Sequence, residues 1–194
     1  MNSKFEKYDG LIFDCDGTLI DSMPVHYVAW KATMLKYGIH FSEARFYALG
    51  GVPVFEIIKT LAEDAGKELD IEAVADEKEK MFIANMHEAQ AIDEVVAIAR
   101  ANLGKKPMAV ASGTAGWALE LELKHIGIYD WFDAIVGSDT VKKHKPEPDV
   151  FLEAARQISV EPARCCAFED SDMGIQAAQA AGMDVVDVRE LRKG

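Results

Sequence analysis

The sequence predicts a doubly wound α/β fold: a Rossmann-like core with a parallel sheet, and a small all-helical cap domain inserted after the first strand. Short, continuous apolar runs recur along the chain and alternate with segments of helical pattern. Such runs are typical of strands buried on both faces of a parallel sheet, and their alternation with helices indicates the doubly wound arrangement. Between residues 22 and 89 the alternation is interrupted, because the pattern there is helical and contains no buried strand.

Five apolar runs are the predicted strands. The first three are followed by Asp14, Ser112 and Gly137, and the fourth by a pair of acidic residues. Several helical segments end at a glycine, which is a common helix stop. Pro148 stands where proline favours the first turn of a helix. The predicted strands cover residues 11–13, 108–111, 134–136, 165–168 and 184–188.

The helical stretch predicts a domain of its own. Its candidate helices cover residues 25–37, 54–65 and 71–88, with a turn at residues 50–53. Because the stretch directly follows the first strand, we expect it to form a cap on the α/β core. The expected boundaries are 1–21 and 90–194 for the core and 22–89 for the cap.

Composition and charge narrow the possible partners. The 194 residues include 33 acidic and 21 basic side chains, a net charge of -12. This balance argues against nucleic acid and anionic membrane surfaces, which favour clustered lysine and arginine. No uncharged apolar run approaches the roughly 20 residues that cross a bilayer, the start lacks a signal peptide, and the three cysteines lack metal-binding spacing. We expect a cytoplasmic monomer that acts on a small molecule.

Two carboxylates after the first strand carry the strongest chemical signal. Asp14 and Asp16 are separated by one residue and followed by a glycine. Asp14 could attack phosphorus as a nucleophile, which divides a difficult displacement into two steps. Asp16 could then protonate the leaving oxygen and deprotonate the attacking water. The alternative is an aspartate-rich turn without catalytic function.

Three further sets of residues fit a phosphate site. Ser112 and Gly113 offer a hydroxyl and backbone amides to a phosphate oxygen, although Ser112 could instead cap a helix. Lys145, directly before a proline, could neutralise charge on the phosphoryl group, although the basic run from residue 142 could simply be solvated. Glu169 and Asp170 suit Mg²⁺, although they could also cap the next helix.

The placement of these residues favours function over the structural alternatives. Asp14, Ser112 and Asp170 each follow a predicted strand. In open α/β sheets, ligands bind beyond the carboxyl ends of the strands, so one fold would bring the three side chains together.

These motifs resemble the haloacid dehalogenase-like superfamily, in its β-phosphoglucomutase-like branch. The matching positions are residues 14–18, Ser112, Lys145 and the Glu169–Asp170 pair. The resemblance implies that Asp14 is the nucleophile, Asp16 the general acid and base, and Ser112 and Lys145 phosphate ligands. It also implies Mg²⁺ bound by Asp14, the main-chain carbonyl of Asp16 and Asp170, with Glu169 in or near its shell.

In the cap, the resemblance leaves two questions open. His26 matches a hinge histidine that contacts the substrate or Asp16, but it could equally be a packed helix residue. Where the mutases of this branch have an arginine just after the cap's glycine turn, this chain has Val54, directly after residues 51–53, and Arg45 lies upstream. Gly51 and Val54 are therefore candidates for substrate contact. Without that arginine, a bisphosphate lacks its second anion site.

The resemblance therefore implies a Mg²⁺-dependent phosphatase of a small sugar phosphate. The fructose-1-phosphate phosphatase type of this branch is the best match, with fructose 1-phosphate or a 6-phosphogluconate-like compound as substrate. One alternative is a β-phosphoglucomutase. Another is a catalytically silent module that binds a phosphorylated metabolite, although pure binding would not need the acid/base Asp16.

Overall fold

The computed structural model describes residues 5–50 and 52–193. The chain divides into two compact units. One comprises Met1–Asp21 and Gln90–Gly194, and the other comprises Ser22–Ala89. Each unit has a hydrophobic core of its own.

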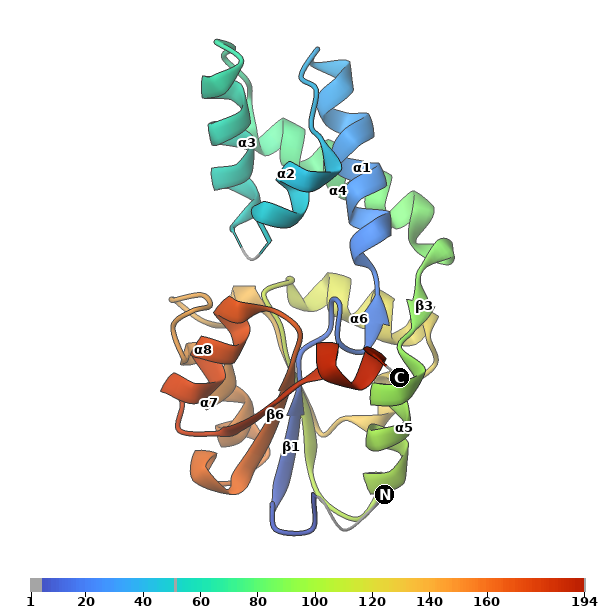
Figure 1. The fold of residues 1–194 in the computed structure, drawn as a ribbon, viewed down its shortest axis with the longest axis vertical. Coiled ribbons are helices and arrows are strands. Elements are labelled where there is room, and N and C mark those ends of the chain that lie inside the picture. The colour runs from blue at the N-terminus through green and yellow to red at the C-terminus, as the bar shows by residue number, and fades with distance from the viewer. Residues whose placement is uncertain (1–4, 51, 194) are drawn as a thin grey trace. The chain divides into compact units, whose positions relative to one another are not determined.

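A five-stranded parallel sheet forms the centre of the first unit (Figure 1). Its strand order is β5-β4-β1-β6-β7, and Leu11 of the central strand β1 lies in register with Met108 of β4 and Cys166 of β6. All five predicted strands are present, so the predicted fold class is confirmed. The strands are β1 (Gly10–Phe13), β4 (Met108–Ala111), β5 (Ala134–Val136), β6 (Cys165–Glu169) and β7 (Asp184–Asp187).

Helices cover both faces of this sheet, with α7 and α8 on one side and α5 on the other (Figure 1). Phe151 of α7 is buried with Ile12 and Ala109 on the first face. On the other face Phe13 stacks on Phe168, with ring centroids 4.5 Å apart. The helices are α5 (Asp93–Asn102), α6 (Gly116–His125), α7 (Asp149–Gln157) and α8 (Asp172–Ala180), with short 3₁₀ turns η3 (Tyr129–Trp131), η4 (Ser138–Thr140), η5 (Pro162–Arg164) and η6 (Val188–Lys193).

A second, two-stranded sheet in the first unit pairs the segment that precedes residue 22 with the segment that follows residue 89. Strand β2 (Ile20–Asp21) pairs antiparallel with β3 (Gln90–Ala91), and Ile20 lies in register with Ala91. The sequence did not predict these strands, because two residues are too few to show a period.

The second unit is helical. Its core consists largely of aromatic and branched side chains, including Trp30, Phe41 and Ile58. The three predicted helices are present, and the short α2 was missed. Ser42 caps α2, its hydroxyl accepting the amide of Arg45 at 3.3 Å. The helices are α1 (Met23–Lys36), α2 (Glu43–Ala48), α3 (Val54–Asp64) and α4 (Ile71–Asn85), followed by the turn η2 (Met86–Glu88).

Among the described residues, no helix combines the length and the apolar character that crossing a membrane requires.

Candidate active site

The loop after β1 places Asp14 at the carboxyl end of the sheet. The Asp14 amide donates to the carbonyl of Phe168 at 3.0 Å, and its side chain is almost fully buried. Gly17 has a φ of +78°, and a Cβ there would lie 2.2 Å from Oδ2 of Asp170. Glycine is therefore required twice over, for the left-handed backbone and for the close approach of Asp170.

Lys145 joins the first acidic motif to the second. Its Nζ donates to Oδ1 of Asp14 and to Oε1 of Glu169, both at 2.7 Å. Burial opposes its charge, but the carboxylates of Asp14 and Glu169 outweigh that effect and raise the pKa of Lys145. The lysine is therefore a fixed cation beside the predicted nucleophile.

The acidic side chains at the ends of β1 and β6 form one cluster. One carboxylate oxygen each from Asp14, Glu169 and Asp170 lies within 4.8 Å of the others. Burial is the main reason that the pKa of Asp14 is raised well above its usual value. Burial, with the nearby Glu169, also raises the pKa of Asp170 to about 7. One lysine cannot neutralise three carboxylates, so the cluster is suited to a cation.

Glu169 is held by the start of α8. Its Oε2 accepts the amides of Asp170 and Ser171, both at 2.8 Å, and the Ser171 hydroxyl at 3.0 Å. A Cβ on Gly174 would lie 1.6 Å from Oε1, so only glycine fits there. Ser171 itself caps α8, its hydroxyl accepting the Gly174 amide at 3.0 Å. Ser171, rather than Glu169 or Asp170, is therefore the residue that caps α8.

The loop after β4 reaches Asp16. Thr114 Oγ1 donates to Oδ2 of Asp16 at 2.6 Å, and the Thr114 amide donates to the hydroxyl of the buried Ser112 at 3.1 Å. Ser112 does not cap α6, because the first amide of that helix, on Gly116, donates to Asp139 at 2.9 Å. Gly113 is exposed, with nothing within 4 Å of an added Cβ. The contact between Thr114 and Asp16 was not predicted, because the two residues lie 98 positions apart in the sequence.

In the helical unit, His26 packs against an aromatic ring and also lies beside a charged side chain. Its ring stacks on Phe82 with centroids 3.8 Å apart, and its Nδ1 lies 3.1 Å from Nζ of Lys78. Lys78 is only 3% exposed and forms an ion pair with Glu79 at 2.9 Å. Sequence reasoning missed Lys78. The signal was its position, because it lies midway between Val74 and Phe82 on the buried stripe of α4.

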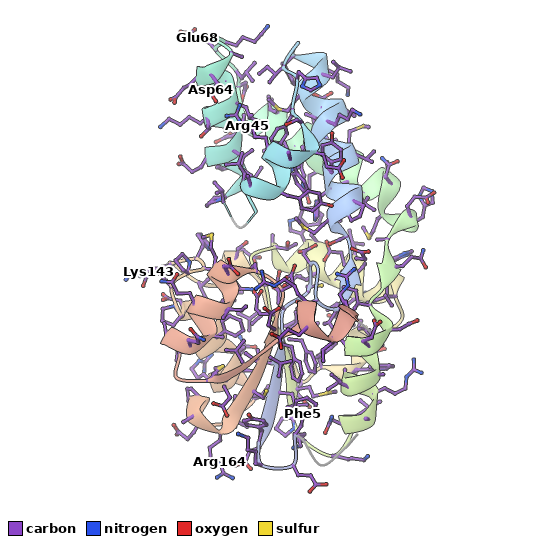
Figure 2. The ribbon with its side chains drawn as sticks, in the orientation of Figure 1. Phe5, Arg45, Asp64, Glu68, Lys143 and Arg164 are labelled. Carbon is purple, nitrogen blue, oxygen red and sulfur yellow. The ribbon has the colours of Figure 1, made fainter. Side chains whose placement is uncertain are left out.

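The remaining candidates of the helical unit have different surroundings. Val54 is the first residue of α3 and packs against the helical core. Gly51 lies outside the described residues. Arg45, the arginine upstream of the glycine turn, forms an ion pair with Asp64 (Figure 2).

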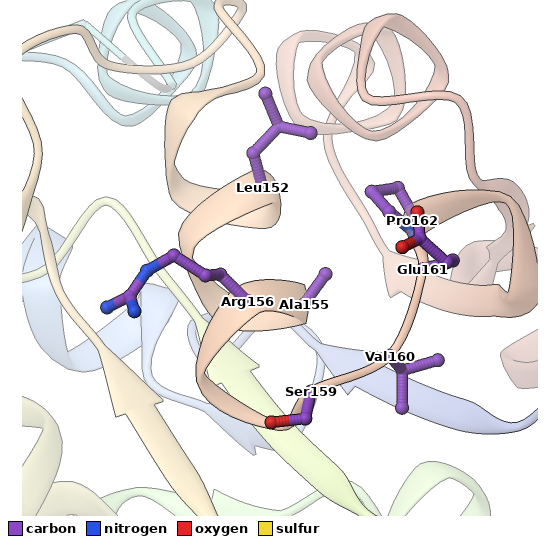
Figure 3. A pocket seen from close by; sticks show the side chains of 7 residues that line it. All are labelled: Leu152, Ala155, Arg156, Ser159, Val160, Glu161 and Pro162. Atoms are coloured by element: carbon purple, nitrogen blue, oxygen red, sulfur yellow. The ribbon is translucent and has the colours of Figure 1, made fainter.

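A depression of about 410 Å³ lies on the first unit, at the end of α7 (Figure 3). Its wall includes Leu152, Arg156 and Pro162. Pro162 precedes the start of β6, whereas Glu169 ends that strand. The depression is therefore at the opposite end of the strand from the acidic cluster and is separate from it.

Comparison with protein families identifies the class of this protein. The model of the haloacid dehalogenase-like hydrolase family matches residues 11–188, and the chain belongs to this family. The predicted resemblance is thereby confirmed, as is the prediction of an enzyme of the hydrolase type.

Curated relatives match over nearly the whole chain. The fructose-1-phosphate phosphatase YqaB of Escherichia coli K12 is 41% identical, over 96% of this chain and 100% of its own length. The β-phosphoglucomutase of Bacillus subtilis 168 is 32% identical, over 92% of this chain and 82% of its own.

Solved structures also match most of the chain. A β-phosphoglucomutase from Clostridium difficile superposes with a TM-score of 0.79 at 27% identity, over 96% of this chain and 88% of that one. CbbY from Rhodobacter sphaeroides, in complex with phosphate, superposes with a TM-score of 0.81 at 25% identity, over 92% and 84%.

Proposed function

We propose that this protein is a Mg²⁺-dependent phosphatase of a small sugar phosphate, which acts through an aspartyl-phosphate intermediate. The observation that carries the proposal is the pairing of two carboxylates with different partners. Asp14 is bound by the cation of Lys145, and Asp16 by the hydroxyl of Thr114. Residues held in this way can act separately, with Asp14 as the nucleophile and Asp16 as the general acid.

In the first step, a carboxylate oxygen of Asp14 attacks phosphorus and the bond from phosphorus to the sugar oxygen breaks. Asp16 gives its proton to that oxygen, so the sugar leaves as a neutral alcohol. In the second step, Asp16 takes a proton from water, and the oxygen of that water attacks phosphorus. The bond to Asp14 breaks, and inorganic phosphate is released with both aspartates restored.

Thr114 and Lys145 prepare these two residues. The bond from Thr114 to Oδ2 of Asp16 would fix the orientation of the carboxyl group that carries the proton. Lys145 binds Oδ1 of Asp14, so the attack would come from Oδ2. The lysine would also neutralise charge on the transferring phosphoryl group, together with the Ser112 hydroxyl and the backbone at Gly113.

The residues at the cluster fit Mg²⁺. Their donors are carboxylate oxygens, which this hard cation prefers, and Lys145 forms ion pairs with two of the three acids, Asp14 and Glu169. Asp14, Asp170 and the main-chain carbonyl of Asp16 would hold the ion. Glu169 would lie beside it, because Lys145 and the start of α8 already bind its oxygens. When bound, the ion reduces the repulsion between the Asp14 carboxylate and the phosphate.

Hydrolysis is favoured over the mutase alternative by the helical unit. A mutase must hold a second anion, and Arg45 is the only arginine between residues 22 and 89. Its guanidinium is paired with Asp64. The relative named as a fructose-1-phosphate phosphatase matches along its full length, which supports fructose 1-phosphate or a 6-phosphogluconate-like compound as the substrate.

The test is turnover across a panel of sugar phosphates, with and without Mg²⁺. The panel contains fructose 1-phosphate, 6-phosphogluconate and β-glucose 1-phosphate with its bisphosphate, and both free phosphate and glucose 6-phosphate are followed. We expect Mg²⁺-dependent release of phosphate. Formation of glucose 6-phosphate without free phosphate would make the enzyme a mutase. Binding without turnover of any member of the panel would indicate that the protein is a catalytically silent module that binds a phosphorylated metabolite.

A further inference from the structure

Helix α6 contains a buried acid to which the proposed reaction gives no part. Glu122 is fully buried, although its buried neighbours on the helix, Ala118, Leu119 and Leu123, are apolar. Burying a carboxyl group is unfavourable unless hydrogen bonds replace its contacts with water. Its presence at a core position therefore indicates a specific partner.

One such partner is Cys15, which stands between the two catalytic aspartates. Its Sγ donates to Oε2 of Glu122 at 3.3 Å, and both residues are fully buried. A carboxylate oxygen of Glu122 also lies within 4.8 Å of one of Asp16. The acid thus reaches the centre of the catalytic loop from a helix more than a hundred positions away.

Cys15 is also the residue around which the loop is folded. Its main-chain carbonyl accepts three amides, those of Thr18, Leu19 and Ile20, at 3.1, 2.8 and 3.1 Å. The turn after Asp16 therefore closes on Cys15. A side-chain contact that fixes Cys15 would fix the backbone on both sides of it, including Asp14 and Asp16.

We propose that Glu122 is a positioning residue, which holds the loop of Asp14 and Asp16 in place through the thiol of Cys15. Together with the bond from Thr114 to Asp16, it gives α6 and the residues before it two points of attachment to this loop. A leucine at position 122 could fill the space, but it would not fix the direction of the Cys15 side chain. The expected effect on kcat rests on the proposed function, whereas the expected effect on the structure of the loop does not.

Four single variants test the proposal. Glu122→Leu and Cys15→Ala remove the hydrogen bond, whereas Glu122→Gln and Cys15→Ser keep an acceptor and a donor. We expect the first two to lower kcat roughly 10- to 100-fold with KM unchanged, because small displacements of catalytic groups reduce turnover strongly. The two conservative variants should stay within about threefold of wild type. Thermal unfolding and circular dichroism show which variants are folded.

A double-mutant cycle then separates this contact from general damage. If the hydrogen bond acts as one unit, Cys15→Ala with Glu122→Leu lowers kcat no further than the worse single variant. If the double variant instead lost kcat by the product of the two single losses, the proposal would be overturned. A folded Glu122→Leu enzyme with the kcat of the wild type would also overturn it.

Hydrogen exchange gives a readout that does not need a substrate. In Glu122→Leu, the amides of Thr18, Leu19 and Ile20 should exchange faster, while those of α7 remain as in the wild type. Unchanged exchange at these three amides would overturn the proposal even if kcat fell. If the wild type releases phosphate from no member of the panel, the proposed function fails, and this comparison still decides whether Glu122 positions the loop.

Discussion

At the scale of single residues, the nucleophile gives the sharpest prediction. We expect Asp14→Asn to lower phosphatase turnover by at least about 10³-fold, because an amide is a poor nucleophile towards phosphorus. Burial already raises the pKa of Asp14, so a neutral side chain there should leave the fold intact. Steady-state kinetics and thermal unfolding of the same preparation check both parts. Substantial residual turnover would contradict the covalent mechanism.

Variants of Thr114 test whether turnover requires the hydrogen bond that orients Asp16. Thr114→Val keeps the shape but removes the donor to Asp16, and we expect kcat to fall roughly 10- to 100-fold. Thr114→Ser retains the hydroxyl and serves as the matched control, with kcat near that of the wild type. Equal kcat values for the two variants would show that the bond from Thr114 to Asp16 has no part in turnover.

The proximity of the acidic residues could be predicted from the sequence because each lies at or just beyond the carboxyl end of a strand. Asp14 and Asp170 are next to, or one residue beyond, an apolar run, and the edge of a parallel sheet gathers such positions. The contacts of Thr114 with Asp16 and of Glu122 with Cys15 could not be predicted in this way. Thr114 lies in the loop after β4 and Glu122 on α6, and nothing local distinguishes them from a helix start and a surface acid.

At the scale of elements, the junction of β6 and α8 depends on a glycine. A Cβ on Gly174 would overlap Oε1 of Glu169, which is itself held by Lys145. We expect Gly174→Ala to lower the free energy of unfolding by about 1–3 kcal/mol, the usual effect of overpacking, despite the better helix propensity of alanine. Chemical denaturation measures this change.

Gly113→Ala is the matched control for stability, since nothing lies within 4 Å of the added methyl group. It should change the free energy of unfolding by less than about 0.5 kcal/mol. If Gly174→Ala were as stable as Gly113→Ala, the close packing of α8 on Glu169 would not be a requirement of the fold.

The larger elements could be predicted because they are long or fully apolar. The five core strands coincide with the apolar runs to within one residue at their ends. The helix and strands that were missed are the shortest of their kind in the described part of the chain: α2 with six residues, and β2 and β3 with two each. Such elements exist through their tertiary contacts, which leave no periodic pattern in the sequence.

At the scale of the whole molecule, stability should depend on pH and Mg²⁺ together. The pKa of Asp170 is about 7 in the folded protein, against 3.8 as its ordinary value. Because the folded carboxyl group binds a proton more tightly, its ionisation is destabilising; this effect is absent below about pH 4 and fully present above about pH 7. Without metal, this group should therefore lower the melting temperature as pH rises through that window.

Mg²⁺ should reverse this effect, since it competes with the proton for the cluster. At one fixed concentration, about 100 times the Kd at pH 8, the ion should raise the melting temperature by about 5–10 °C at pH 8 and by much less at pH 5.5, where the proton weakens its binding. Scanning calorimetry with Mg²⁺ and with a chelator measures the difference, and Asp170→Asn is the control that should lose most of it. An equal gain at both pH values would contradict a cation site at Asp170.

The net charge of -12 sets the background for these effects. A protein with this charge repels anions at long range, so a phosphate ester must be attracted locally by Lys145 and the metal. The monomeric state, the cytoplasmic location and the role of residues 22–89 as a cap stay predictions.

The paired strands β2 and β3 have a consequence for how this protein can diversify. Asp21, where the chain leaves the first unit, lies in register with Gln90, where it returns. The intervening segment is therefore inserted between two adjacent positions, like a loop on a hairpin. Insertions, deletions or replacements within it need not shift the register of the sheet that bears Asp14 and Asp170. Because we predict that the inserted segment selects the substrate, we expect its exchange to change substrate preference while Asp14 and Asp170 stay in place.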